Sequence, residues 1–154
     1  MKQFLDLLAE HPFFHDLPRE DIEFIATCGR NVAFRAGAQI AREGDSADAF
    51  YVIRKGRAAI EMYAPGRGSL RVQTVGEGDV LGWSWLIPPH RWVFDVRALQ
   101  DVRAIALDGR CLRGKCDENH EVGYLLMRRF AQLLTRRLEA TRIQLLDLYS
   151  DKVV

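Results

Sequence analysis

The sequence contains no long apolar segment, since no run approaches the roughly 18 residues that a membrane-spanning helix requires. No basic segment followed by an apolar stretch opens the chain, so no signal peptide is visible. The 22 Lys and Arg residues nearly balance the 21 Asp and Glu residues, which gives a net charge of +1. Such a balance provides no general attraction to nucleic acid or to membrane surfaces. We therefore expect a cytoplasmic protein without a membrane partner.

The sequence also has few cysteines, namely Cys28, Cys111 and Cys116. An odd number of scattered cysteines is typical of reduced thiols in a cytoplasmic protein. Cys111 and Cys116 lie near His120, but their spacing differs from that of a zinc knuckle, and a closed tetrahedral site needs four ligands. We therefore expect no metal site.

No arrangement of Ser, His and Asp, or of Cys and His, has the pattern of a nucleophilic catalytic site. The histidines His11, His15 and His90 are separated from one another and from any nucleophile motif. The sequence therefore predicts no catalytic residues, no enzyme activity and no resident cofactor.

A chain of 154 residues with a hydrophobic fraction of 48% is long enough to bury the core of one domain. We expect this single domain to cover residues 1–154. It would comprise N-terminal helices at 1–30, a β-rich region at 31–107 and C-terminal helices at 108–150.

Apolar residues at helical spacing predict a first helix over residues 2–10. A second helix is predicted to begin at Leu17 and Pro18 and to end at Gly29.

The region from 31 to 107 alternates short apolar pieces with turns, which is typical of a jelly-roll or barrel of short strands. The predicted turns are Gly37, Gly44-Asp45, Gly56, Pro65-Gly66-Arg67-Gly68, Gly76-Glu77-Gly78-Asp79 and Pro88-Pro89. The second-last segment of the chain, 108–117, fits a short helix. The predicted fold class is therefore mainly β with helices.

A long helix is predicted from about His120 to Tyr149, because this segment has no proline and only one early glycine. Seven of its residues follow spacings of four and three and form a heptad seam: Met127, Ala131, Leu134, Leu138, Thr141, Leu145 and Leu148. The seam predicts a homodimer, although an amphipathic helix packed on its own β-roll has the same pattern. A second apolar stripe, which would let one helix serve both contacts, consists of Leu125, Leu126, Phe130, Leu133 and Leu146.

The segment from Phe34 to Arg57, FRAGAQIAREGDSADAFYVIRKGR, resembles the cyclic-nucleotide-binding domain family. This family provides the sensor module of catabolite activator proteins and of cyclic-nucleotide-regulated kinases and channels. The resemblance extends from about Leu17 to Tyr149. It implies a β-roll flanked by N-terminal helices and one long C-terminal helix, with a small anion such as cAMP or cGMP bound in the roll.

The family holds the cyclic phosphate with a cassette that matches residues 78–98, GDVLGWSWLIPPHRWVFDVRA. Gly82 matches the cassette glycine. Trp83 stands where the family has a glutamate for the ribose hydroxyl, and an indole cannot accept a hydrogen bond from that hydroxyl. Trp92 stands at the position of the family's arginine, with Arg91 one residue earlier. Arg91 would reach the phosphate only if the next strand begins after it or bulges there.

Ser84 is a further candidate, because its hydroxyl could donate to an anion. The tryptophans Trp83, Trp85 and Trp92 leave two interpretations open: they line a pocket for an apolar or aromatic ligand, or they fill the space as core.

Other positions agree better with a nucleotide site. Ile60 and Val72 match apolar residues that contact the base in the family. Within the long helix, Thr141 matches a base-binding threonine. Arg142 stands where a residue reaches the pocket of the partner subunit, and an arginine there could stack on a base. The alternatives are a polar break in the seam for Thr141 and a solvated flank for Arg142.

Two functions therefore remain open. One is a non-catalytic regulatory sensor that binds a cyclic nucleotide or a related small anion and signals through its long helix. The other is a degenerate, ligand-free β-roll scaffold for dimerisation and protein–protein contacts. The family's transcription factors continue past the long helix into a helix-turn-helix, which these 154 residues do not contain. We therefore expect no direct DNA binding and an unknown downstream protein partner.

Overall fold

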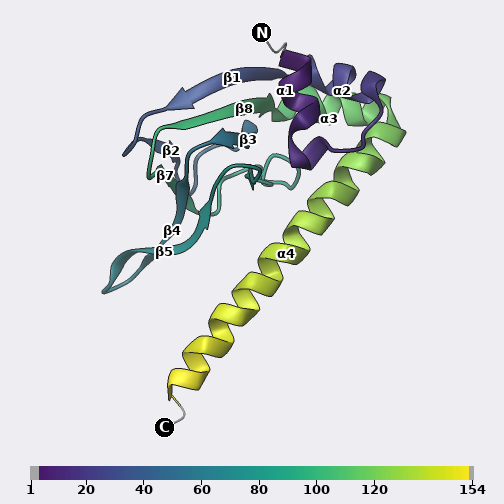
Figure 1. Cartoon of the computed structure of the whole chain (residues 1–154). Coiled ribbons are helices and arrows are strands. Elements are labelled where there is room, and N and C mark those ends of the chain that lie inside the picture. Colours follow the sequence, from purple (N-terminus) through teal and green to yellow (C-terminus); the bar gives the residue numbers. More distant parts are fainter. Residues whose placement is uncertain (1–3, 153–154) are drawn as a thin grey trace.

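The computed structural model describes residues 4–152, and two antiparallel sheets form its centre (Figure 1). One sheet has the strand order β1-β8-β3-β6, and the other has the order β2-β7-β4-β5. The strands are β1 (Gly29–Phe34), β2 (Gln39–Ala41), β3 (Ala49–Lys55), β4 (Ala58–Ala64), β5 (Gly68–Val75), β6 (Val80–Leu81), β7 (Asp95–Ala98) and β8 (Val102–Asp108). Together they form the β-roll that the sequence predicts.

Three short helices precede the sheets: α1 (Phe4–Glu10), the 3₁₀ helix η1 (Pro12–Phe14) and α2 (Arg19–Ala26). α1 begins within the segment predicted to be helical, whose first two residues lie outside the described ones. α2 carries Glu20 and Asp21 in its first turn, where carboxylates interact favourably with the helix dipole.

α2 ends at Ala26, three residues before the predicted end at Gly29. Gly29 is instead the first residue of β1. A Cβ atom at this glycine would lie 3.0 Å from the ring of Phe4, so its small size lets α1 approach the sheet.

An aromatic core joins the N-terminal helices to the sheets and to the long helix. The ring centroids of Phe13 and Phe130 are 4.9 Å apart, and those of Phe50 and Phe130 are 5.1 Å apart. Trp85 stacks on Phe50 at 5.1 Å. Edge-to-face and offset-stacked rings of this kind are the preferred aromatic arrangements. This aromatic core therefore fixes the start of the long helix relative to β3.

A second core lies inside the roll. Along β7, Val96 and Ala98 are buried while Arg97 between them is exposed, because side chains alternate across a strand. Ile53 of β3 and Ile60 of β4 are buried in the same cluster. This cluster forms the floor on which the candidate site is built.

β4 and β5 form the hairpin predicted at residues 65–68. Gly66 and Gly68 have φ values of +81° and +79°, which residues with a Cβ atom rarely adopt. Because this turn requires glycines, the hairpin could be predicted from the sequence.

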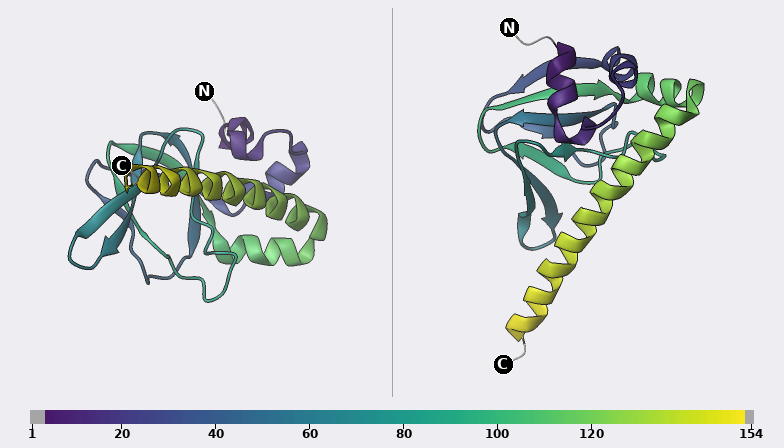
Figure 2. Two further views of the ribbon diagram at one scale, coloured as in Figure 1. Left: turned by 90° about the horizontal axis from the view of Figure 1, so that it is seen from below. Right: turned by 45° about the vertical axis from the view of Figure 1, so that its right-hand side comes forward.

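Two helices end the chain, α3 (Gly109–Glu118) and α4 (His120–Lys152). The side chain of Asp108 caps α3 by accepting from the backbone N–H of Cys111 at 2.7 Å. Asn119 Oδ1 accepts from the N–H groups of Glu121 and Val122 and so begins α4. At 33 residues α4 is about 50 Å long, and its last turns extend past the strands (Figures 1 and 2).

Only the first part of α4 is anchored in the core. Its buried residues are Val122, Gly123, Leu126, Phe130 and Leu133. From residue 134 to 150, within the described side chains, none is buried. Leu146 is 64% exposed, so the predicted second stripe does not continue to it, because the roll ends before this turn of the helix.

Cys28 and Cys111 form a disulfide with a Cα–Cα distance of 5.7 Å. This corrects the expectation of three reduced thiols. The two cysteines are 83 residues apart in sequence, and only the pairing of β1 with β8 brings them together. Cys116 is free and half-buried, and burial raises the pKa of its thiol.

Among residues 4–152, no helix combines the length and the apolarity needed to cross a membrane.

Candidate ligand-binding site

A cavity of about 470 Å³ lies between the β4–β5 hairpin, the segment that follows β6, and α4. This volume is within the usual range of small-molecule sites, roughly 300–1,000 Å³. Its lining residues are mostly apolar: Ile60, Met62, Val72, Gln73, Trp83, Val93, Phe94, Leu134, Arg137, Leu138, Thr141 and Gln144. The cavity therefore contains Ile60, Val72, Trp83 and Thr141, four of the residues that the sequence nominates for ligand binding.

The interior of the roll behind this cavity is filled by Trp92. A Cβ atom at Gly82, where φ is +98°, would lie only 2.7 Å from Cη2 of the Trp92 indole. Trp92 is buried, stacks on Tyr51 with centroids 6.4 Å apart, and meets Phe94 at 6.0 Å. The indole thus occupies the space beside the glycine at which the family resemblance places the phosphate.

The other two tryptophans of this segment diverge. Trp85 is fully buried in the aromatic core, stacked on Phe50. Trp83 is half-buried, lines the cavity and meets Phe94 edge-on at 5.3 Å. Both alternatives raised by the sequence therefore apply: two tryptophans are core and one is exposed to the cavity. Ser84 is buried next to them and is not part of the lining.

Arg91 lies outside the cavity. Its Nη1 donates to the backbone carbonyl of Gly44 at 2.8 Å, and the side chain is exposed. β7 begins only at Asp95, so the strand does start after Arg91, yet the side chain bonds to the loop between β2 and β3 and does not line the cavity. His90, with φ of +57°, redirects the chain just before it. The alternation of side chains along a predicted strand does not reveal a turn of this kind, so the direction of Arg91 could not be predicted from it.

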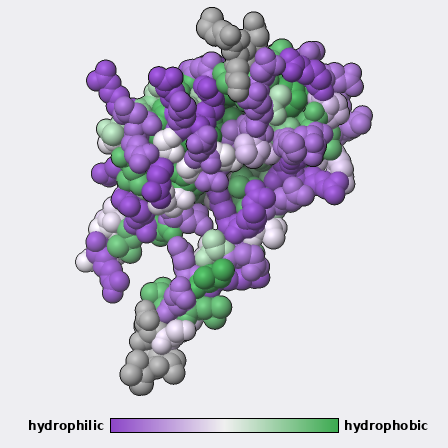
Figure 3. Space-filling model, in the orientation of Figure 1, coloured by the Kyte–Doolittle hydropathy of each residue, from purple (hydrophilic) through white to green (hydrophobic). Residues whose placement is uncertain are grey.

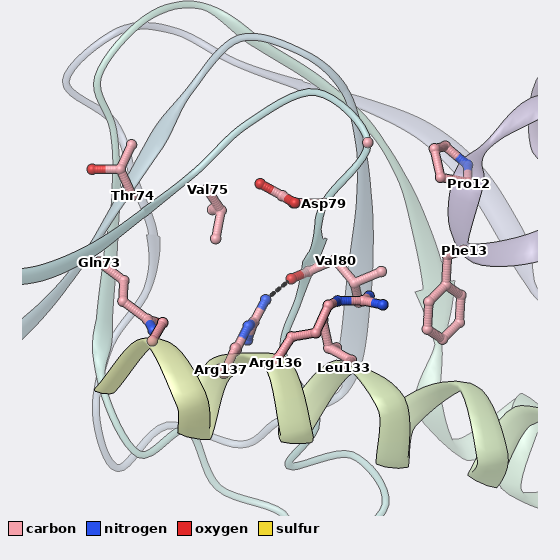
Figure 4. A pocket seen from close by; sticks show the side chains of 12 residues that line it. Pro12, Phe13, Gln73, Thr74, Val75, Asp79, Val80, Leu133, Arg136 and Arg137 are labelled. Atoms are coloured by element: carbon pink, nitrogen blue, oxygen red, sulfur yellow. Dashed lines mark hydrogen bonds between the residues drawn. The ribbon is translucent and has the colours of Figure 1, made fainter. Parts of the chain in front are cut away.

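Arg137 is the one charged residue of the cavity lining, and it is not among the residues predicted from the sequence to bind a ligand. The signal available was its place one turn before Thr141 on the same face of the predicted helix. The guanidinium donates through Nη2 to the carbonyl of Val80, as Figure 4 shows. Its central carbon lies 5.3 Å from the centroid of the Trp83 ring, within cation–π range.

The charge of Arg137 is incompletely compensated. Nη1 is buried and has no hydrogen-bond partner. Among the described residues, no ion pair to the guanidinium is present, although Asp79 acts on it electrostatically. Burial lowers the pKa of Arg137 to about 10, against the opposing effect of Asp79, so the group stays cationic at neutral pH. A buried cation without a full set of acceptors favours an anion.

Arg137 also borders a second cavity, of about 510 Å³, on its other side (Figure 4). That cavity is lined by Asp79, Arg136 and Pro12 among others, and so contains an acidic group of its own. Arg136 turns toward Phe13 rather than toward Arg137 (Figure 4).

Three further residues of α4, at and beside the cavity, already have hydrogen-bond or ion-pair partners within the chain. The hydroxyl of Thr141 donates to the carbonyl of Arg137 at 2.9 Å. Gln144 Nε2 donates to the carbonyl of Val72 at 2.8 Å and so ties α4 to β5. Arg142 is exposed, pairs with Glu139 at 3.0 Å and is not part of the cavity lining.

The heptad seam of α4 is exposed in the single chain. Met127, Leu134, Leu138, Leu145 and Leu148 are all apolar and exposed, as are Ala131 and Thr141. Figure 3 shows apolar side chains on the part of α4 that extends beyond the roll. Leu134, Leu138 and Thr141 line the cavity beside the roll but stay exposed, so the roll of the same chain does not bury the seam, and the dimer stays a prediction.

Within residues 4–152, no group of three or more His, Cys, Asp or Glu residues is placed to hold a metal ion.

The profile of the cyclic nucleotide-binding domain matches residues 31–119, which is more than half of the chain. The chain belongs to this family, whose members are ligand-binding regulatory domains rather than enzymes. The matched segment begins within β1 and includes the other strands of the β-roll and α3.

A curated relative, the CRP-like cAMP-activated global transcriptional regulator of Mycobacterium tuberculosis, is 28% identical over 144 residues. The match covers 93% of this chain but only 62% of the length of that relative. Among solved structures, a candidate cyclic nucleotide-binding protein from Geobacter metallireducens has a TM-score of 0.79 and 27% identity, over 89% of this chain and 99% of that one. A cyclic nucleotide-binding domain from Methylobacillus flagellatus has a TM-score of 0.83 at 20% identity, over 94% and 83% of the two chains, and this match concerns the fold alone.

Proposed function

We propose that this domain is a regulatory sensor that binds a small anionic ligand in the cavity between the β-roll and α4. One observation carries the proposal: the cavity is walled by β4 and β5 on one side and by α4 on the other. A ligand inside it contacts both elements, so it biases their relative position. Cyclic AMP and cyclic GMP are the first candidates, because the family binds cyclic nucleotides and the Mycobacterium tuberculosis relative is described as activated by cAMP.

The signal would travel through α4. Two hydrogen bonds connect this helix to the roll near the cavity, from Arg137 to Val80 and from Gln144 to Val72. A ligand that competes for Arg137 or displaces Gln144 favours a different position of the helix, which is the differential interaction that a two-state switch requires. The anchored first turns of α4 would act as the fixed end of this motion.

A homodimer through the seam of α4, and a downstream protein partner that responds to it, complete the proposal. Leu138 and Leu145 are about half exposed on this 33-residue helix. A second helix that covers such leucines removes their apolar surface from water and so stabilises the dimer. The cytoplasmic location and the absence of direct DNA binding also stay predictions.

The second candidate function is a ligand-free scaffold. The observation that favours it is the Trp92 indole, which fills the roll beside Gly82. If the family's phosphate pocket is permanently closed by this ring, the roll would serve only to present α4.

Calorimetric titration with cyclic AMP and cyclic GMP separates the two candidates. Dissociation constants in the micromolar range or below, about −8 kcal/mol, support a cyclic-nucleotide sensor. The absence of heat with both nucleotides, on protein shown to be folded and dimeric, supports the scaffold unless another anion binds. Arg91→Ala, titrated in parallel, tests whether the arginine of the cassette binds the nucleotide. An unchanged nucleotide affinity would show that Arg91 is not part of the site.

A further inference from the structure

We infer that the cavity beside α4 selects a flat apolar or aromatic ligand that carries a single carboxylate, with Arg137 as the partner of the carboxylate. This inference rests on the proposed sensor function and names the ligand class of the same site. It differs from a cyclic nucleotide in the body of the ligand, which has neither a ribose nor a phosphodiester.

The first step concerns the polar groups of the lining. The described residues that line the cavity include no Asp or Glu, so no carboxylate is present to accept from a ribose hydroxyl. Trp83 stands nearest to the cassette, and its indole N–H can only donate. The hydroxyl of Thr141 and the amide N–H of Gln144 already donate to backbone carbonyls. The side-chain amides of Gln73 and Gln144 also line the cavity and can accept from a hydroxyl, but as neutral groups they bind a ribose less strongly than the carboxylate that the family uses.

The second step concerns the apolar walls. Ile60, Val72 and Phe94 face the cavity from the roll, and Leu134 and Leu138 face it from α4. These walls lie on opposite sides of the space, so a flat apolar body inserted between them loses its water on both faces. The half-buried ring of Trp83 adds an aromatic surface on which another ring stacks well.

The third step fixes the charge and its place. Arg137 is the only charged lining residue, and its buried Nη1 has no partner within the described chain. A guanidinium matches one carboxylate through charge-assisted hydrogen bonds, and a ligand that draws Nη1 out of its buried position supplies the acceptor that this nitrogen lacks. Because the guanidinium lies over the Trp83 ring at 5.3 Å, a carboxylate bound there brings the ring system of the ligand alongside Trp83.

The neighbouring cavity does not offer the same match. It presents the carboxylate of Asp79, which repels an anion, and the exposed Arg136. A ligand with an apolar body and one anionic group is therefore better accommodated on the side of Trp83, where the walls are mostly apolar and no carboxylate lines the cavity.

The test uses 2-naphthoate and its neutral analogue of the same shape, 2-naphthamide, and follows binding to the full chain by calorimetry and by the fluorescence of the tryptophans. We expect naphthoate to bind roughly ten- to hundredfold more tightly than naphthamide, which is the usual value of a hydrogen bond to a charged group. Arg137→Gln should remove this preference, so that naphthoate binds no more tightly than naphthamide. Arg136→Gln changes the neighbouring arginine, which is not part of this lining, and as the matched control it should keep the full preference.

Because Arg137 also binds Val80, the Gln variant could lose stability, so Val72→Phe provides a second test that leaves the arginine in place. Filling the cavity from β5 should weaken naphthoate and naphthamide alike. Equal binding of the two probes to the wild-type protein, or a preference that survives Arg137→Gln, would overturn the inference.

The failure of this inference and the failure of the proposed function differ in outcome. Tight binding of cyclic AMP or cyclic GMP without charge-selective binding of naphthoate leaves the sensor intact and overturns the ligand class. No binding of either nucleotides or naphthoate overturns both and supports the scaffold.

Discussion

At the scale of single residues, Gly82 shows how tightly the roll is filled. Its φ of +98° and the 2.7 Å approach of the Trp92 indole both exclude a side chain. Gly37 has a similar φ of +88°, but a Cβ atom there would meet nothing within 4 Å. The pair therefore separates the effect of the backbone angle from the effect of the packed ring.

We expect Gly82→Ala to lower the free energy of unfolding more than Gly37→Ala does, by about 1–3 kcal/mol, because only the former overpacks the interior. Urea denaturation of the two variants measures the difference. Equal losses would mean that Trp92 moves aside readily, which would also reopen the space for a phosphate.

His11 is a second residue whose environment has a measurable effect. Nδ1 accepts from the N–H of Phe13 at 3.2 Å, and Nε2 bonds to the carbonyl of Ile53 at 3.0 Å. Since Nδ1 accepts, the neutral ring carries its proton on Nε2. Burial lowers the pKa of His11 below 6.5, despite opposing effects of the Ile53 carbonyl and of Asp79.

A lowered pKa in the folded state means that the unfolded chain takes up the proton first as the pH falls. The contribution of neutral His11 to the free energy of unfolding is therefore fully present above pH 6.5. It is lost as the pH falls from this value to the lower pKa of His11 in the folded protein. The decline is at most about 1.4 kcal/mol per pH unit. His11→Asn keeps an acceptor for Phe13 but cannot titrate. Urea denaturation at about pH 7.5 and about pH 5.5 should show a smaller loss for this variant than for the wild-type protein, and identical losses would contradict the prediction.

At the scale of elements, the sequence predicted most of what repetition or turn chemistry determines. The hairpin at 65–68 requires glycines, and the long helix follows from its periodicity and lack of proline. The segment before β7 was less predictable, because it has no regular period and His90 turns it in a left-handed conformation. For this reason the sequence could not predict that Arg91 lies outside the cavity or that Trp92 fills the roll.

The candidate site divides in the same way. Ile60, Val72 and Thr141 lie on regular elements, and the family pattern placed them at the cavity. The importance of Arg137 depends on which neighbours bury it, namely Trp83 and Val80, and these lie more than 50 residues away in the chain. Neither spacing nor residue type could show that one of its nitrogens lacks a partner.

The seam of α4 gives a prediction at this scale. Leu138→Asp should weaken dimerisation at least about tenfold, since a carboxylate would be buried against an apolar partner helix. Ile143→Asp is the matched control, because Ile143 is an equally exposed apolar residue of α4 outside the seam. Sedimentation equilibrium measures both constants. A monomer at all concentrations for the wild-type chain, or equal effects of the two variants, would contradict the proposed dimer.

At the scale of the whole molecule, the disulfide between Cys28 and Cys111 connects the end of the N-terminal helices to α3 across 83 residues. Closing so long a loop restricts the unfolded chain strongly. We expect Cys111→Ser to lower the free energy of unfolding by about 2–4 kcal/mol. Cys116→Ser, at the free thiol, should change it little.

Urea denaturation with and without a reductant provides the check. The reductant should destabilise the wild-type protein and the Cys116→Ser variant but not the Cys111→Ser variant. A wild-type protein that ignores the reductant while a free-thiol assay counts three accessible thiols on unfolding would show that the bond does not form in solution.

The seam and the cavity share Leu134, Leu138 and Thr141. Occupancy of the cavity and association of two chains are therefore linked equilibria. If the ligand changes the dimerisation constant by some factor, dimerisation changes the ligand affinity by the same factor. The apparent affinity of this domain then depends on how much of the protein is present. In a cell, the level of expression would set the ligand threshold at which the domain responds.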